Sequence, residues 1–326
     1  MNRLPRWMFM GIFVFVAIAL GFLLHHFRGA PTPPWQRQSE VETSSEPGKR
    51  AIPPTLPEGE TADPAPFRFI TYNVKNWLVS SQSPIKSEKA KNAVIRLLHQ
   101  AEPDIIGLSE IGDTNDVAEI QKRLKAAGTD LPFSYYTGGV DPVRHLAILT
   151  RFPIVHTASP ALKIHGKDYS MQRGILDATL QIGSGEVRFI GLHLKSKRTV
   201  PDLDQALLRI DEASHVRKHI DSILSARPDS KLVVYGDLND TTRSLSTRAL
   251  LGTYRSPGYL SAIRVKDSRG ESWTHHYASE DSYTRIDFVT VSKALRSRVD
   301  KSKSVIIDDP GWEDASDHRP VMVVFR

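Results

Sequence analysis

Residues 231–240, KLVVYGDLND, constrain the fold more than any other stretch of the sequence. The apolar, partly β-branched run 232–234 is typical of a buried strand, and Gly236 interrupts it just before a cluster of Asx residues. A strand that ends in polar groups delivers them to the rim of its sheet. If strand alternation continues, Asp237 and Asn239 point to the same side, so that a carboxylate and an amide face one substrate group. The alternative for these residues alone is an Asx-rich turn that caps the next helix.

An apolar run of 18 residues without a charge, 7–24, lies close to the N-terminus. It is long enough to cross a bilayer, and it lacks the small-residue cleavage pattern of a signal peptide. The sequence therefore predicts an uncleaved transmembrane helix as a membrane anchor over residues 1–28, with a cleaved signal peptide and a secreted protein as the alternative. Arg3 and Arg6 precede the run and Arg28 alone follows it. This asymmetry predicts a single pass with the N-terminus inside and the rest of the chain on the periplasmic or extracellular side.

Residues 29–66 contain nine prolines mixed with Ser, Thr and Glu, and they show no apolar periodicity. This composition predicts a disordered linker rather than a domain.

The net charge of +6 lies wholly in residues 67–326. Residues 1–66 hold six Lys and Arg against six Asp and Glu, which leaves 37 against 31 in the rest of the chain. Such an excess suits a phosphate-bearing partner and also fits ordinary solubility. The chain has no cysteine, so any metal ion must be held by oxygen and nitrogen ligands.

Apolar strands alternate with amphipathic helices across residues 67–326, which we expect to form one domain. Gly183 and Gly185 predict a hairpin whose arms are residues 174–182 and 186–193. Thr114 is the expected N-cap of the second helix. The remaining expected strands are 67–72, 104–108, 133–136, 145–150, 284–292 and 320–325, and the expected helices are 90–101, 114–127 and 202–226.

Polar side chains recur at the ends of these apolar runs. Asp287 differs from the others because it interrupts its run, IDFVTV, where a buried carboxylate is costly unless a cation, a histidine or a metal ion pairs with it. Any one of these residues taken singly fits a strand-end cap or a turn. The full set is Asn73, Glu110, His193, Asp237, Asn239, Asp287, Asp317 and His318.

Six short motifs contain these residues, and together they resemble the endonuclease/exonuclease/phosphatase superfamily in order and spacing. They are YN at 72–73, SEI at 109–111, HLKS at 193–196, GDLN at 236–239, RIDFV at 285–289 and SDHRPV at 316–321. The resemblance covers residues 67–326. It implies an α/β fold, a four-layer α/β/β/α sandwich of two mainly antiparallel sheets, with one active site at the rim of the sheets.

The resemblance also implies a metal site. Glu110 would be the principal ligand of a divalent ion, with Asn73 beside it and Asp317 completing the site. Oxygen ligands of this kind suit Mg²⁺ or Mn²⁺.

Catalytic roles follow from the same resemblance. Asp237 would activate a water molecule for attack on phosphorus, and Asn239 would fix the water or the phosphate. His193 and His318 would hold the non-bridging oxygens. Asp287 would orient one of the two histidines, with His318 the expected partner.

Two basic residues are expected to contact substrate. Arg173 and Lys195 would bind the phosphate backbone, although a solvated basic face explains them equally well. Ser109 stands where many members of the superfamily have Gln before the metal-binding Glu, and the longer LQE-T/S-K signature of abasic-site enzymes is absent. These departures argue against a dedicated DNA-repair role.

The sequence thus predicts a membrane-tethered, divalent-metal-dependent phosphodiesterase, with a nuclease acting on DNA or RNA as the first choice. Its partners would be nucleic acid as substrate and a membrane through the N-terminal helix, and no protein partner can be inferred. A phospholipid or sphingomyelin phosphodiesterase, or a phosphatase, is the alternative that the membrane anchor would also suit. A non-catalytic binding module on the same fold is a third possibility, against which the full set of site residues counts.

Overall fold

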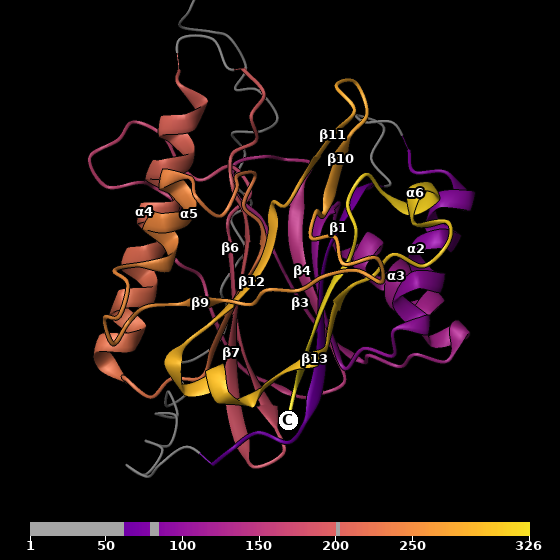
Figure 1. Cartoon of the computed structure of the whole chain (residues 1–326), viewed down its shortest axis with the longest axis horizontal. Helices are drawn as coiled ribbons and strands as arrows, with labels where there is room; N and C mark the ends of the chain where they lie inside the picture. Colours follow the sequence, from indigo (N-terminus) through magenta and orange to yellow (C-terminus); the bar gives the residue numbers. More distant parts are fainter. Residues whose placement is uncertain (1–61, 79–84, 200–202) are drawn as a thin grey trace, which may run out of the picture. The chain divides into compact units, whose positions relative to one another are not determined.

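The computed structural model describes residues 62–78, 85–199 and 203–326, which belong to one compact unit, Gly59–Arg326 (Figure 1). The predicted anchor over residues 1–28 and most of the predicted linker 29–66 lie outside the described residues. Of the helices that are described, none has the length and apolar character needed to span a bilayer. The anchor therefore stays a prediction.

Two six-stranded sheets form the centre of the described unit. The first has the strand order β13–β14–β1–β2–β4–β3, and the second has the order β5–β6–β7–β8–β12–β9. Each sheet is mixed, because β1 pairs with β2 and β7 pairs with β8 in parallel, while the other neighbours run antiparallel. The prediction of an α/β fold built on two sheets is confirmed.

The bounds of the strands follow the apolar runs of the sequence closely. The first sheet contains β1 (Phe67–Trp77), β2 (Ile105–Ile111), β3 (Phe133–Thr137), β4 (His145–Thr150), β13 (Val299–Ile306) and β14 (Val321–Phe325). The second contains β5 (Ile154–Ala158), β6 (Ile175–Ile182), β7 (Gly185–His193), β8 (Leu232–Asp237), β9 (Ser261–Ala262) and β12 (Asp287–Val291). A separate two-stranded ribbon consists of β10 (His275–Tyr277) and β11 (Ser282–Thr284).

Helices cover the outer face of each sheet, so four layers follow one another across the unit (Figure 1). The helices α2 (Glu88–Gln100), α3 (Thr114–Ala127) and α6 (Trp312–Ala315) pack on the first sheet, and α4 (Gln205–Ala226) and α5 (Leu245–Leu251) pack on the second. The apolar stripe of α2 faces inward, as its spacing predicts. The expected cap of α3 at Thr114 is wrong. Asp113 is the N-cap, because its carboxylate accepts from two backbone amides and Asp116 completes a capping box.

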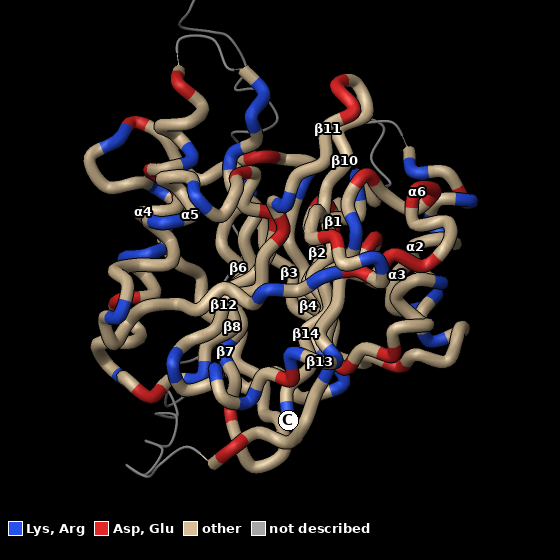
Figure 2. The backbone as a smooth tube through the Cα atoms, in the orientation of Figure 1, with Lys and Arg blue, Asp and Glu red and all other residues tan. Residues whose placement is uncertain are grey.

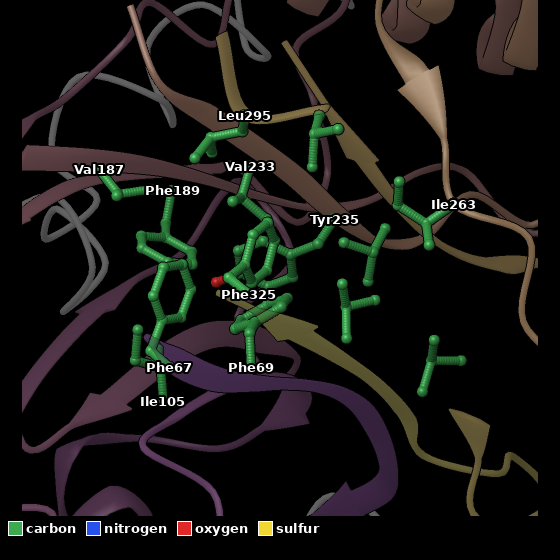
Figure 3. Packing of buried hydrophobic residues seen from close by; sticks show 14 of the residues in the cluster. Phe67, Phe69, Ile105, Val187, Phe189, Val233, Tyr235, Ile263, Leu295 and Phe325 are labelled. Carbon is green, nitrogen blue, oxygen red and sulfur yellow. The ribbon is translucent and has the colours of Figure 1, made fainter. Parts of the chain in front are cut away.

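The core between the two sheets is rich in aromatic rings (Figure 3). Phe67 and Phe325, paired across β1 and β14, stack with ring centroids 4.4 Å apart. Phe69 meets the edge of Tyr235 on the opposite sheet at 4.7 Å. The second contact joins the two facing sheets, and contacts of this kind fix their relative position. They therefore hold the ends of β1 and β8 at one rim.

One predicted strand, 284–292, is divided in the structure. Residues 282–284 belong to the β10–β11 ribbon, and β12 begins only at Asp287. The break occurs because the backbone amides of Ile286 and Asp287 both donate to the hydroxyl of Thr274, each at 3.1 Å, instead of to a neighbouring strand. Consequently Asp287 is the first residue of its strand and lies at the rim.

Candidate active site

The ends of strands from both sheets meet at one rim. β1 and β2 contribute Asn73 and Glu110 from the first sheet, while β7, β8 and β12 contribute His193, Asp237 and Asp287 from the second. His318 joins them from the segment between α6 and β14. The parallel pairs place these side chains together, because parallel neighbours end at the same edge of a sheet.

The backbone is bent where β1 and β2 reach this rim. The pairing of β1 with β2 changes register between Asn73 and Trp77, and the pairing of β2 with β4 changes register between Ser109 and Ile111. Glu110, at the second bulge, has a left-handed φ of 62°. That conformation costs a residue with a side chain roughly 1 kcal/mol or more, and bulges of this kind redirect side chains beside active sites. The bulge turns Glu110 toward the site.

Asn73 connects carboxylates from the two sheets. Its side-chain amide donates to Glu110 Oε1 at 3.3 Å and to Asp237 Oδ2 at 3.1 Å. The second oxygen of Glu110 accepts from the backbone amide of Asn76 at 3.1 Å, and Arg144 Nε lies 3.9 Å from it. Among the described residues, Glu110 thus has neutral partners at hydrogen-bonding distance, and its one cationic neighbour, Arg144, is farther away.

Gly236 allows β8 to end beside β7. Its φ is 129°, and a Cβ atom there would lie 1.9 Å from the carbonyl oxygen of Leu192.

The prediction that strand alternation turns the side chains of Asp237 and Asn239 to the same side is wrong, because β8 ends at Asp237 and Asn239 adopts a left-handed φ of 51°. The two residues are instead joined through the backbone. Asn239 N donates to Asp237 Oδ1 at 2.8 Å, and its side-chain amide donates to Leu194 O at 3.0 Å.

His318 is a buried cation held by Asp287. Its Nδ1 donates to Asp287 Oδ2 at 2.8 Å, and its Nε2 lies 3.8 Å from Asp237 Oδ2. Burial opposes the charged imidazolium, but the carboxylates of Asp287 and Asp237 outweigh it and raise the pKa of His318 to about 10. Of the two histidines, Asp287 therefore pairs with His318, which carries a positive charge at neutral pH.

Asp237 is the carboxylate with the most perturbed environment in the cluster. Burial, with Asp287 adding to it, raises its pKa to about 7, while the charge of His318 acts in the opposite direction. At neutral pH this carboxyl is therefore poised between its two protonation states. A group in that position is suited to accept a proton.

His193 and Arg173 have buried nitrogens that lack a hydrogen bond in the described chain. His193 Nε2 lies 3.5 Å from Asp237 Oδ2, and burial together with Arg173 and His318 holds the pKa of His193 well below its usual value, so the ring is neutral. His193 Nδ1 and the Nε and Nη1 atoms of Arg173 are buried without a hydrogen-bond partner among the described residues. The nearest acid to Arg173 is Asp141, at 3.5 Å. Buried donors left in this state point to a ligand that completes them.

Comparison with known proteins agrees with this geometry. The sequence profile of the Endonuclease/Exonuclease/phosphatase family matches residues 71–318. The chain belongs to this family. Members of the family are typically hydrolytic phosphoesterases and generally depend on a divalent metal ion. A comparison of the sequence with curated proteins found no match.

Solved structures show the same fold. The catalytic domain of human Nocturnin, solved with a bound sulfate anion, has a TM-score of 0.61 at 18% identity and covers 80% of this chain and 94% of its own. A truncated TDP2 from Caenorhabditis elegans has a TM-score of 0.55 at 16% identity, and the match covers 80% of this chain and 97% of that one. An endonuclease/exonuclease/phosphatase family protein from Bacteroides thetaiotaomicron has a TM-score of 0.58 at 19% identity, and the match covers 81% of this chain and 96% of that one. At these identities the likeness shows the fold alone.

Asp317 and its neighbours form the outer edge of the family site. Asp317 Oδ2 pairs with Lys75 Nζ at 3.0 Å, and the ring of His275 lies 4.5 Å from that of His318. Burial acts to raise the pKa of Asp317. The positive charges of His318 and Lys75 act in the opposite direction and outweigh burial, so the pKa of Asp317 lies below its usual value. Sequence patterns gave no sign of Lys75 here, and the signal for His275 was only a pair of adjacent histidines.

Glu110 suits a hard cation, because it offers a carboxylate whose hydrogen-bond partners in the described chain are neutral. Asn73 turns its amide nitrogen toward Glu110, its Oδ1 accepts from Lys75 N at 3.0 Å, and Asp317 pairs with Lys75, so the parts of Asn73 and Asp317 as ligands stay predictions. In the described part of the chain, two groups of acids and histidines come close enough together to hold an ion. Both include His318, which its pairing with Asp287 keeps protonated. Glu110 is therefore the better anchor for a divalent ion.

Lys195 lies close to the site but is occupied by its own loop. The side chain is buried, and its ammonium donates to the backbone carbonyls of Ser196 at 3.1 Å and Arg198 at 3.2 Å. Burial, followed by repulsion from Arg173, lowers the pKa of Lys195. Its contact with substrate stays a prediction, whereas Arg173 has nitrogens free to make one.

Proposed function

We propose that this protein is a divalent-metal-dependent phosphodiesterase that hydrolyses DNA or RNA. The observation that carries the proposal is the meeting of two features at one rim. Asp237 is a carboxyl poised to accept a proton, and two buried nitrogens beside it, His193 Nδ1 and Arg173 Nη1, have no hydrogen-bond partner in the described chain. A phosphodiester anion matches the second feature, and a water molecule that attacks it matches the first.

The reaction uses the chain's residues in complementary ways. Asp237 takes a proton from the attacking water as the new oxygen–phosphorus bond forms, with Asn239 N on its other oxygen. The imidazolium of His318 stabilises negative charge that builds on the non-bridging oxygens. As the opposite phosphorus–oxygen bond breaks, its electron pair stays on the leaving oxygen, which is protonated by solvent. When bound at Glu110, Asn73 and Asp317, Mg²⁺ or Mn²⁺ supplies Lewis-acid neutralisation of the phosphate charge.

A lipid phosphodiester is the second candidate substrate. The β10–β11 ribbon forms a bridge from His275 to His318, and it carries the half-exposed rings of Tyr277 and Tyr283. Exposed aromatic rings next to a phosphodiester site suit the headgroup region of a membrane. Against this, Arg144, Arg173 and Lys75 lie around the site, each beside an acid of the chain, and cations at several positions suit a substrate with several phosphates.

The substrate is tested directly with the full-length protein in detergent. We expect hydrolysis of single-stranded DNA or RNA with Mg²⁺ or Mn²⁺ and none in EDTA. Glu110→Gln should weaken metal activation because a neutral amide cannot replace the carboxylate charge. Glu186→Gln, at the opposite end of the second sheet, is the matched control. Cleavage of sphingomyelin or phosphoinositide vesicles without cleavage of nucleic acid would transfer the proposal to the lipid substrate, and full activity in EDTA would remove the metal.

The proposed enzyme is tethered by its N-terminal helix, with the catalytic domain 67–326 outside the cytoplasm. The charge-free run 7–24 supports this arrangement. A reporter fused after Arg326 should behave as extracytoplasmic, and the mature protein should retain residues 7–24. A mature N-terminus within residues 25–40 would show a cleaved signal peptide and a secreted enzyme instead.

A further inference from the structure

A second basic feature lies along the free edge of the second sheet, beside β9 and β12. It is a hollow of about 970 Å³, here called the edge groove, between the segment 251–266, β12 and the 3₁₀ helix Lys293–Arg298. Seven Lys and Arg residues line it in the described structure, and none of its lining residues is Asp or Glu. The catalytic roles derived above use none of these cations.

The segment after β9 shows how the sequence builds this basic surface. Ile263 and Val265 are buried in the core between the sheets, while Arg264 and Lys266 between and after them are exposed. Ile263 N bonds to Val289 O at 2.9 Å, and Lys266 O accepts from the backbone of β13 at 3.0 Å. The segment thus crosses the open side of the sandwich, and Figure 2 shows Lys and Arg along it. Strand-like alternation places the apolar side chains inward and the cations outward.

The cations of the edge groove lack anionic partners. No ion pair within the described residues involves Arg264, Lys266 or Arg285. Arg285 is partly buried, with Nη2 on Ile263 O at 2.6 Å and a buried Nε that has no hydrogen-bond partner in the described chain. Burial and then the charge of Arg264 lower the pKa of Arg285. Cations held together without an acid are stabilised when an anion binds.

Aromatic rings complete the lining. Tyr254 is 69% exposed, and its ring meets Tyr259 edge-on with centroids 5.3 Å apart. The guanidinium of Arg255 lies 5.3 Å from the centre of the Tyr254 ring. An exposed ring supported by a second ring and flanked by a cation offers a platform on which a nucleic-acid base can stack.

We propose that the edge groove binds a single strand of nucleic acid, with backbone phosphates on Arg264, Lys266 and Arg285 and a base on Tyr254. The inference rests on the proposed nuclease function and adds a holding site to it. Unpaired bases are needed because the bases of a duplex are stacked on one another and cannot reach a tyrosine in a hollow. A hollow also suits a strand better than the broad surface of a membrane.

The position of the groove connects it to the site of cleavage. Arg285 lies two residues before Asp287, and Asp287 contributes to its electrostatic environment. From there the lining continues away from the rim to Lys293, Arg296 and Lys301. A strand cut beside His318 would extend into the groove, so that longer substrates are held more tightly than short ones.

The test compares two doubly substituted proteins of equal charge change. Arg264→Glu with Lys266→Glu alters the groove, and Lys122→Glu with Lys125→Glu alters exposed residues of α3 on the other helical layer. Binding of a fluorescent 20-nucleotide single strand is measured in Mg²⁺ on an Asp237→Asn background, which is expected to slow cleavage about 10²–10⁴-fold. We expect the groove variant to bind about tenfold more weakly or worse, and to lose about 1.4 from the log–log salt slope, at about 0.7 for each of two contacts. The control should bind as the parent protein does.

Two further measurements distinguish a loss of strand binding at the edge groove from a general loss of folding or catalysis. With Asp237 restored, the groove variant should hydrolyse bis-p-nitrophenyl phosphate normally while its KM for the long strand rises. Tyr254→Ala should weaken strand binding several-fold, and Tyr254→Phe should not, because stacking needs the ring and not the hydroxyl.

Each other outcome overturns the proposal in a distinguishable way. Equal binding by the two double variants, with nucleic acid still cut by the parent protein, removes the edge groove and leaves the nuclease function intact. Hydrolysis of the small diester without binding or cleavage of nucleic acid removes both. Loss of binding to phosphatidylserine vesicles in the groove variant alone, with strand binding unchanged, would assign the groove to an anionic membrane.

Discussion

His318 and Arg319 are adjacent in the chain and both are buried, yet they belong to clusters of opposite character. His318 faces Asp287 and Asp237 at the rim of the sheets. Arg319 points the other way and pairs with Asp267 at 2.7 Å, with both side chains fully buried. Its guanidinium also lies 3.3 Å from the centre of the Trp273 ring and donates to the carbonyl oxygen of that residue.

The two clusters differ in how completely each buried carboxylate is paired with cations and hydrogen-bond donors. Asp267 accepts from Arg319 and from two backbone amides, and these partners outweigh burial and lower its pKa. Burial raises the pKa of Asp237 to about 7 even though His318 is close, and the negative charge of Asp287 adds to that rise. A paired buried charge stabilises a loop, whereas an incompletely paired one is available for chemistry. The two clusters should therefore respond differently to substitution and to pH.

The largest effect should come from Asp237→Asn. We expect turnover of a phosphodiester to fall about 10²–10⁴-fold, since the amide cannot accept a proton from water. The melting temperature should stay the same or rise, because the substitution relieves a desolvated carboxylate of nearly the same shape. Steady-state kinetics with Mg²⁺ and thermal unfolding of the same preparation measure both. A variant that unfolds while its folded fraction keeps full activity would make Asp237 a structural residue.

Asp267→Asn should show the reverse pattern. It leaves the guanidinium of Arg319 buried without its counter-charge, which costs about 3–5 kcal/mol in the free energy of unfolding. For a domain of this size the melting temperature should fall on the order of 10 °C. Turnover per folded molecule should change little at a temperature where the variant is folded. Loss of turnover in fully folded protein would mean that the Asp267–Arg319 pair takes part in the chemistry.

The pH dependence of the reaction distinguishes the clusters without a mutation. Asp237 must be deprotonated to accept a proton, so activity should rise as pH passes about 7 and fall about tenfold per unit below it. His318 must be protonated to stabilise negative charge, so activity should decline again as pH rises through about 10. Rate profiles of kcat/KM on a small diester give these limbs. A lower limb near the usual pKa of an aspartate would show that burial does not raise the pKa of Asp237 in the working enzyme.

Much of the fold was predictable because buried strands carry apolar runs of the right length. The edge strand β13 was missed, since its centre, Lys301–Lys303, is polar and exposed. The break between β11 and β12 was missed too, because it depends on a hydroxyl from Thr274, which is distant in sequence. Local patterns thus indicate what is buried, but edges and breaks depend on contacts made only after folding.

The residues of the candidate site could be predicted from the sequence where their side chains come directly after an apolar strand. The resemblance to the family made His318 the expected partner of Asp287, and the hydrogen bond between them confirms it. The residues alone did not decide between the two histidines. The turn at Asn239 was considered only as the alternative to a continued strand, because Asn tolerates a left-handed φ but also fits the end of a strand. The edge groove was also missed. Its cations, from Arg255 to Lys301, are scattered along the chain and gather only when β9 crosses to the edge.

Thr274 lies between the two clusters and should give the smallest effect. Its hydroxyl accepts from the amides of Ile286 and Asp287, and its carbonyl accepts from Arg319 N at 2.7 Å. Thr274→Val keeps the shape but leaves two buried donors unpaired, which should cost about 1–3 kcal/mol of stability. Because Asp287 would then be less firmly placed against His318, turnover should fall by about tenfold or less, as expected for a small misplacement.

The accompanying change in the pH profile identifies the cause of that loss. A looser Asp287 holds the proton on His318 less strongly, so the upper limb should move to lower pH while the lower limb of Asp237 stays near its place. Thr274→Ser retains the hydroxyl and should restore both stability and the upper limb. If Thr274→Val lowers stability without moving that limb, Thr274 supports only the structural cluster. The two clusters would then be independent despite lying one residue apart.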